Sequence, residues 1–300
     1  MVDEVRATVA QAANTFGMAH RSPAAGCAAL IRAIGPRVRT RIERPMPSDF
    51  DPLTRELDLW KDAGRVAEFW WRDDDAVAPT PALDRLLKLS DAFGIEIGVA
   101  IVPAPASDDI AGALAGHPGA VPLQHGFRHK NHAPPGAPAI ECGGARPVAE
   151  VLRELEAGAA RMRALFGARF GEILAAPWNH IEPPVLAKLA ASGFRGASAY
   201  GPRAAMQANG LVVANVHVDP MNWRERRFAS TEKALSSILG ELAARRTGMS
   251  DPQEPLGLLT HHLDHDEALW DFLPRFFEVT AAHPAARWLT LRETFAGVAA

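Results

Sequence analysis

Short apolar segments alternate with segments of helical periodicity along most of this sequence, and this alternation limits the possible folds more than any other feature. The apolar run Ile95–Val102 and the helical pattern of Val148–Phe166 are its clearest members. Strands are predicted at Val66–Arg72, Ile95–Val102, Ala120–Gln124, Ile173–Pro177, Arg195–Ala199, Leu211–Val218, Pro255–Thr260 and Arg287–Thr290. Strands that alternate with helices form parallel sheets. About seven or eight such units in roughly 240 residues fit a (β/α) barrel better than an open sheet.

The segments between the strands predict the helices that would cover such a barrel. They are Asp51–Ala63, Pro79–Phe93, Ile110–Ala115, Val148–Phe166, Pro184–Ser192, Thr231–Arg246 and Glu267–Ala282, followed by a closing helix. No glycine-rich phosphate-binding motif follows any predicted strand, which weighs against the nucleotide-binding open sheets.

The first part of the chain lacks this alternation. Residues 1–45 are expected to form a peripheral helical extension, with short helices around Ala7–Ala13 and Ala24–Ile34. Pro45-Met46-Pro47 marks the boundary, so that residues 46–300 make the barrel domain.

Charge and cysteine content narrow the partners and the compartment. A net charge of -3 and a pI near 6.4 disfavour a nucleic-acid partner or an anionic membrane surface. No apolar run is long enough to span a membrane, and Met1–His20 does not have the pattern of a secretory signal. Cys27 and Cys142, without CxxC spacing, indicate free thiols. We therefore expect a cytoplasmic protein with a small-molecule or oligosaccharide substrate.

Polar and ionisable residues gather where the predicted strands end. These positions hold Asp73-Asp74-Asp75, His125 to His132, Trp178-Asn179-His180, Asp219 to Trp223, and His261-His262. The opposite ends of the strands carry nothing comparable. An isolated Asp triplet is more often a turn or a helix N-terminus. In a parallel barrel, however, functional residues collect at the C-terminal ends of the strands, so we expect one site there.

His125 and His129 are the first candidate metal ligands. A His-x-x-x-His pair can present two imidazoles to one ion, and the surrounding Gly and Pro residues favour a loop. An aspartate from another strand end would complete a set that leaves positions open for water and substrate. Histidines of a surface loop are the alternative interpretation. A second, adjacent aspartate could act as a base, and His261 or His262 could protonate the leaving group.

These strand ends resemble the motifs of the carbohydrate esterase family 4 deacetylases, the polysaccharide deacetylases, over about Val66 to Thr290. In that family the motifs are Thr-Phe-Asp-Asp-Gly, His-[Ser/Thr]-x-x-His, Arg-x-Pro-[aromatic]-[Gly/Asn], Asp-x-x-Asp-Trp and Leu-x-His. Here the matching segments are Trp71–Asp75, His125–His129, Ala175–Asn179, Asp219–Trp223 and Leu259–His261. All of them in the same order are far more specific than any one alone. The resemblance implies a distorted (β/α) barrel and a metal-dependent deacetylase.

The resemblance also implies residue roles. Asp73 would be the catalytic base and His261 the general acid, with Asp74, His125 and His129 as metal ligands. A register shifted by one residue, which gives the two acidic roles to Asp74 and Asp75, is the alternative match. The substrate-binding residues would be Trp178, Asn179, Asp219, Trp223, Leu259 and His262, with Leu259 lining the acetyl pocket.

Two charged residues of the family pattern are missing. Ala175 stands where the family has an arginine, and Asn222 where it has the second aspartate of the fourth motif. Losing both partners of a buried charge pair is milder than losing one. Arg72 or Arg224 could replace the arginine; otherwise the site is adapted to another amide, or inactive.

We therefore expect a hydrolase of carbon–nitrogen bonds that uses a divalent metal, Zn²⁺ first, and removes an N-acetyl or other acyl group from an amino sugar or polysaccharide-related substrate. Trp178 and Trp223 could pack against sugar rings, although tryptophan also fills cores and rims. The alternatives are a hydrolase of a non-sugar amide and a barrel that binds carbohydrate without catalysis.

Overall fold

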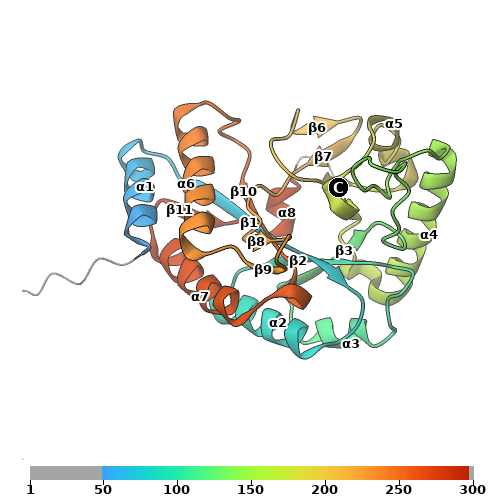
Figure 1. Cartoon of the computed structure of the whole chain (residues 1–300), viewed down its shortest axis with the longest axis horizontal. Helices are drawn as coiled ribbons and strands as arrows, with labels where there is room; N and C mark the ends of the chain where they lie inside the picture. Colours follow the sequence, from blue (N-terminus) through green and yellow to red (C-terminus); the bar gives the residue numbers. More distant parts are fainter. Residues whose placement is uncertain (1–48, 297–300) are drawn as a thin grey trace, which may run out of the picture. The chain divides into compact units, whose positions relative to one another are not determined.

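The computed structural model describes residues 49–296, which form a (β/α) barrel of mostly parallel strands surrounded by helices (Figure 1). The strand order is β10-β1-β2-β3-β4-β5-β7-β6, and β11 pairs with β1. These strands are β1 (Ala67–Ala76), β2 (Ile97–Ile101), β3 (Ala120–His125), β4 (Ile173–Ala175), β5 (Gly196–Ser198), β6 (Gln207–Ala208), β7 (Leu211–Val213), β10 (Leu256–Thr260) and β11 (Ala286–Trp288). The predicted barrel is confirmed. The extension expected over residues 1–45 lies outside the described residues.

Short parallel bridges close the barrel between its two sheet edges. Tyr200 pairs with Val216, and Val218 pairs with Leu258 of β10. The Leu259 amide donates to the Val218 carbonyl at 2.8 Å. The segment after β7 thereby gives the outer side of β10 its hydrogen-bond partners. The ring is distorted because β4, β5 and β7 are only 3 residues long.

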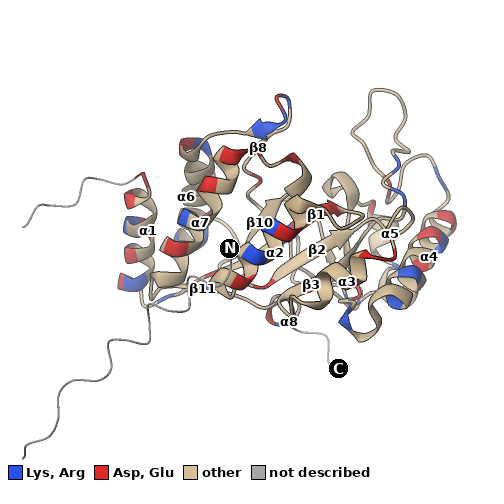
Figure 2. Ribbon diagram, turned by 90° about the horizontal axis from the view of Figure 1, so that it is seen from below, with Lys and Arg blue, Asp and Glu red and all other residues tan. Residues whose placement is uncertain are grey.

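Helices cover the outside of the ring, and local sequence signals begin and end them. They are α1 (Asp51–Asp62), α2 (Pro81–Phe93), α3 (Ile110–Ala115), α4 (Val148–Phe166), α5 (Pro183–Leu186), α6 (Thr231–Thr247), α7 (Glu267–Ala282) and α8 (Leu291–Thr294). The Thr80 side chain caps α2, and Gly94 ends it in the left-handed conformation. Charges of both signs lie along α1, α4 and α6 (Figure 2). None of the described helices is long and apolar enough to cross a membrane.

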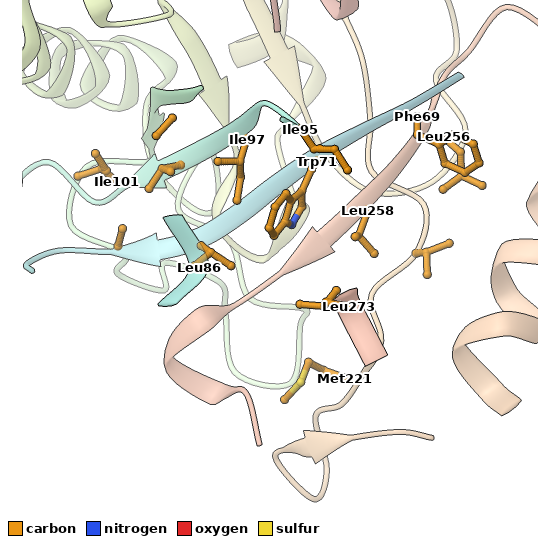
Figure 3. Close-up of a cluster of buried hydrophobic side chains, with 14 of the residues drawn as sticks. Phe69, Trp71, Leu86, Ile95, Ile97, Ile101, Met221, Leu256, Leu258 and Leu273 are labelled. Carbon is orange, nitrogen blue, oxygen red and sulfur yellow. The ribbon is translucent and has the colours of Figure 1, made fainter. Parts of the chain in front are cut away.

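Side chains of β1 alternate between two cores. Phe69 and Trp71 enter the large core between the strands and the helices, where Trp71 and Leu258 lie with Leu273 of α7 (Figure 3). Trp70 points into the ring and packs edge-on against Phe295 at 5.6 Å. Both tryptophans are fully buried, as the alternation predicts for structural residues.

The boundaries of several elements differ from the prediction. Helix Pro184–Ser192 is split into α5 and a 3₁₀ turn, Ala190–Ser192, which ends at Gly193 in the left-handed conformation. The last strand, β11, pairs with the start of β1. A hairpin of β8 (Met221–Asn222) and β9 (Arg227–Phe228), each strand 2 residues long, was too short for a periodic signal. Strand β1 extends through the acidic triplet. Arg72 and Asp73 continue the pairing with β10, and Ala76, after the triplet, pairs with Ile101 of β2.

Barrel closure leaves no room for a side chain at position 257. A Cβ on Gly257 would lie 2.5 Å from the Asn215 carbonyl oxygen and 2.6 Å from the Trp70 indole nitrogen. We predict that Gly257→Ala destabilises the protein by about 1–3 kcal/mol in urea unfolding, as overpacking does. Gly112→Ala is the control, because it sits inside α3 and no described atom outside its own helix turn lies within 4 Å of the position that the new methyl group would take. It should stabilise by about 0.5–1 kcal/mol. Equal stability of the two variants would contradict this account of closure.

Candidate functional site

Three side chains meet where β1 and β3 end. The Asp75 Oδ1 atom lies 3.2 Å from His125 Nε2 and 3.3 Å from His129 Nε2. Their ligand atoms all lie within 4.8 Å of one another. Asp75 is partly exposed and His125 is buried, so the cluster opens towards solvent on one side. Two imidazoles and one carboxylate suit a divalent transition metal in an open catalytic site.

A β-bulge brings Asp75 to this cluster. The register between β1 and β2 shifts between Asp73 and Ala76, and Asp75 has a φ of 72°. Bulges re-aim side chains in this way, often beside functional sites. Without the bulge, alternation would send Asp75 to the same side as Asp73. Instead the Asp75 carboxylate faces the two histidines.

The histidines are oriented by their surroundings. His125 Nδ1 lies 3.1 Å from the Ala175 carbonyl oxygen, which fixes Nε2 towards Asp75. A hydrogen bond at the second ring nitrogen is typical of metal-ligating histidines. His129 has a φ of 53° and packs between the rings of His125, at 5.2 Å, and Trp178, at 4.3 Å.

Electrostatics within the cluster favour an ionised aspartate. Burial alone would raise the pKa of Asp75, but the hydrogen bond and charge of His125, together with the charge of His129, hold the pKa well below its usual range. The pKa of His125 is raised: burial lowers it, but the charges of Asp74 and Asp75 outweigh this effect. Burial and the neighbouring His125 lower the pKa of His129.

A buried ion pair lies next to the cluster, inside the ring. Arg72 Nε is 2.9 Å from Asp74 Oδ1, and Arg72 Nη2 donates to Asp74 Oδ2 at 3.0 Å. The same guanidinium donates to Ser198 Oγ at 2.6 Å and to Asn179 Oδ1. Arg72 and Asp74 are side chains of one strand two residues apart, so both point to the same face. Of the two arginines that the sequence offered in place of the one missing at Ala175, Arg72 thus contacts a carboxylate of the site, whereas Arg224 is exposed.

Asp73 faces the opposite side of β1 and is fully buried. Its carboxylate accepts hydrogen bonds from Thr260 Oγ1 at 2.7 Å and from the His262 amide at 2.9 Å, and it lies 2.5 Å from His262 Nδ1. Burial would raise the pKa of Asp73, but the charge and hydrogen bond of His262 lower it. His262 is also buried, so neither residue opens to the mouth of the barrel.

His261 lies on the side of the mouth formed by β10 and the hairpin. Its ring packs edge-on against Trp223 at 4.5 Å, and Trp223 Nε1 donates to Asp219 Oδ2 at 2.7 Å. The pKa of Asp219 is raised because burial outweighs the opposing charge of His261. The charge of His261 also contributes to the lowered pKa of Asp75. His261 therefore contacts the Asp219–Trp223 pair through the Trp223 ring.

Solved structures share this architecture, although no family model and no curated protein sequence matches the chain. A protein assigned as a polysaccharide deacetylase from Mycobacterium smegmatis is 14% identical, with a TM-score of 0.54 over 77% of this chain and 89% of that chain. The chitin deacetylase from Colletotrichum lindemuthianum is 12% identical, with a TM-score of 0.53 over 77% and 88%. The Xyl-CE4 domain of a multidomain xylanase from the hindgut metagenome of Trinervitermes trinervoides is 11% identical, with a TM-score of 0.50 over 77% and 90%. The chain has the polysaccharide deacetylase fold.

The aspartate that lies with His125 and His129 is Asp75, which the alternative, shifted register names as a metal ligand. The first register placed Asp73 as the base and Asp74 among the metal ligands. Asp73 instead lies behind β1, and Asp74 pairs with Arg72 rather than with the histidines. Strand alternation and the bulge at Asp75 together place the three carboxylates in this way, and no residue pattern in the sequence predicts the bulge.

The predicted substrate-binding residues occupy different depths. Trp178 and Trp223 are 40% and 44% exposed, and Asn179 and Asp219 are half-buried beside them. Leu259 is fully buried in the ring with Trp70, and His262 is buried behind Asp73, so neither lies at the surface of the mouth.

Sequence reasoning missed two residues beside the site. Ser198, at the end of β5, binds Arg72, and Glu141, in the long loop after β3, binds the backbone next to His129. The position of Ser198 at a predicted strand end was an available signal. Nothing in the sequence around Glu141 distinguished it from other loop residues.

His265 interacts electrostatically with Asp73, and its titration offers a test of this region by the pH dependence of stability. Its ring packs against Trp270 at 4.4 Å, and neither ring nitrogen has a hydrogen-bond partner among the described residues. Burial lowers the pKa of His265 to about 4, with Asp73 and Asp266 opposing that effect and His261 and His262 adding to it.

We predict that His265 makes the protein less stable in acid. Between its folded pKa and its usual value of 6.5, the unfolded chain binds a proton that the folded chain does not, so stability falls as pH falls. His265→Gln should reduce the loss of unfolding free energy between pH 7 and pH 5 by about 2 kcal/mol. Urea unfolding of both proteins at the two pH values measures this. An unchanged pH dependence in the variant would show that the folded protein does not hold His265 neutral between pH 7 and pH 5.

Proposed function

We propose that this protein is a metal-dependent hydrolase that removes an acyl group, most readily N-acetyl, from the nitrogen of an amino sugar. The observation that carries the proposal is the Asp75–His125–His129 cluster with the Arg72–Asp74 pair beside it, at the C-terminal mouth of the barrel. The deacetylase fold supports it. A likeness in fold alone does not assign chemistry, so the proposal rests on the site.

The donor set fits a divalent ion, with Zn²⁺ as the first candidate. Asp75, His125 and His129 would hold it, and the Ala175 carbonyl would orient His125. Three protein ligands leave coordination positions for water and for a substrate carbonyl. A bound ion would supply Lewis acidity for activating water and for stabilising the carbonyl oxygen.

Asp74 is proposed as the general base. Arg72 contacts both of its carboxylate oxygens, which fixes the carboxylate next to the ligand cluster. Contacts of Arg72 with Ser198 and Asn179 keep the guanidinium in place. A rigid, correctly oriented base is what proton abstraction from water requires.

His261 is proposed as the general acid that protonates the departing amine. It is the histidine of its pair that packs against Trp223 at the mouth, while His262 is engaged by Asp73. Trp223, whose ring packs edge-on against His261, donates a hydrogen bond to Asp219, so this carboxylate lies on the same side of the mouth as the proposed acid.

The mouth suits a sugar ring. The exposed faces of Trp178 and Trp223 offer surfaces for stacking, and Asn179 and Asp219 offer polar atoms next to them. A small or oligomeric acetamido sugar is therefore the proposed substrate class.

The experiment separates the two acidic roles. Zinc content, measured by mass spectrometry, should be near one per chain in the wild type and in Asp74→Asn, and should be lost in Asp75→Ala. Release of acetate from chito-oligosaccharides should fall in both variants, by about 10²–10⁴-fold in kcat for Asp74→Asn because general base catalysis contributes that much.

Two outcomes would count against the proposal. Zinc retained in Asp75→Ala but lost in Asp74→Asn would restore the unshifted register. Full zinc occupancy without acyl release from sugars or from simple amides would leave a barrel that binds carbohydrate without turning it over.

A further inference from the structure

Glu141 is a buried carboxylate whose oxygens bind backbone amides rather than a lysine or arginine side chain of the described residues. It lies in the loop between β3 and α4 and is only 2% exposed. Its Oε1 atom accepts hydrogen bonds from the amides of Arg128, at 2.7 Å, and Lys130, at 3.4 Å. Its Oε2 atom accepts from the amides of Phe127, at 3.1 Å, and His129, at 3.2 Å. Successive backbone N–H groups that converge on one anion form a stable cradle.

We propose that Glu141 is the positioning residue of the metal site, which it serves by holding the loop that carries His129; this inference rests on the proposed function. His129 has a left-handed backbone, with a φ of 53°, a conformation that costs free energy in a residue with a side chain. The hydrogen bonds to Glu141 span both neighbours of His129 and offset that cost. They fix its imidazole against His125 and Asp75.

Gly126 is matched to Glu141. A Cβ at position 126 would lie 1.9 Å from Glu141 Oε2 and 2.5 Å from Pro177 Cγ, and Gly126 has a φ of 59°. A side chain at this position and the Glu141 carboxylate cannot occupy the same space. Glycine between the two histidines of the motif therefore leaves the space that the Glu141 carboxylate occupies.

Rigid parts of the barrel anchor Glu141 itself. Arg146 donates to the Glu141 carbonyl at 2.8 Å and binds Glu154 of α4 at 2.6 Å. The next residue, Cys142, forms a parallel bridge with Ile181. The carboxylate is thus held from α4 and from the segment after β4, so that it can impose its position on the loop of His129.

The test is the zinc affinity of Glu141→Gln, titrated against a chromogenic chelator with folded protein. The carboxamide presents N–H groups to the backbone donors and removes the charge, so zinc should bind about 10–100-fold more weakly, as for lost outer partners of metal ligands. Glu182→Gln is the matched control. Glu182 also accepts a loop amide, that of Gly144 at 3.0 Å, which lies outside residues 127–130, and the zinc affinity of this variant should equal that of the wild type.

Amide hydrogen exchange in the metal-free proteins gives a second readout. Residues 127–130 should exchange faster in Glu141→Gln than in the wild type or Glu182→Gln. Wild-type zinc affinity in Glu141→Gln would overturn the positioning role and leave the proposed function intact. If the wild type binds no zinc, the proposed function fails, and unchanged exchange at residues 127–130 would then overturn the inference on its own evidence.

Discussion

The alternation of side chains along β1, broken by one bulge, gives three consecutive carboxylates three different environments. Asp73 follows Trp71 to the side of the strand where Thr260 and His262 bind it. Asp74 follows Arg72 into the ring. Asp75, turned by the bulge, faces His125 and His129. A strand without the bulge would leave Asp75 behind the sheet, and the ligand cluster would lack its carboxylate.

Charge compensation is local in this barrel. Position 175 holds no arginine, and the guanidinium beside Asp74 comes from Arg72, two residues before the carboxylate that it contacts. The Ala175 carbonyl meanwhile orients His125. A buried arginine is tolerated because Asp74, Ser198 and Asn179 satisfy its donors. The family pattern's arginine is absent at Ala175 and its second aspartate at Asn222, yet the structure has a guanidinium, that of Arg72, beside a carboxylate.

The loop after β3 shows how irregular backbone is made precise. It contains little regular structure, and its order comes from single side chains: Glu141 holds residues 127–130, and Asn131 binds the amides of Ala133 and Ile140. Functional residues on loops need such support from the scaffold. Trp178 then packs against His129 from the β4 side of the mouth.

The sequence alone predicted the barrel and the edge at which polar residues gather, because both follow from periodicity and from the parallel direction of the strands. It also predicted that His125 and His129 would meet an aspartate from the end of β1. It named Asp74 first and Asp75 only as the alternative, because the bulge and the positive φ that turn Asp75 towards the histidines leave no signal in the sequence. The partners of Arg72 and Glu141 were likewise decided by the tertiary structure. Contacts such as that of Arg72 with Ser198 join residues 126 positions apart in the sequence. Local residue patterns do not predict which distant residues come into contact.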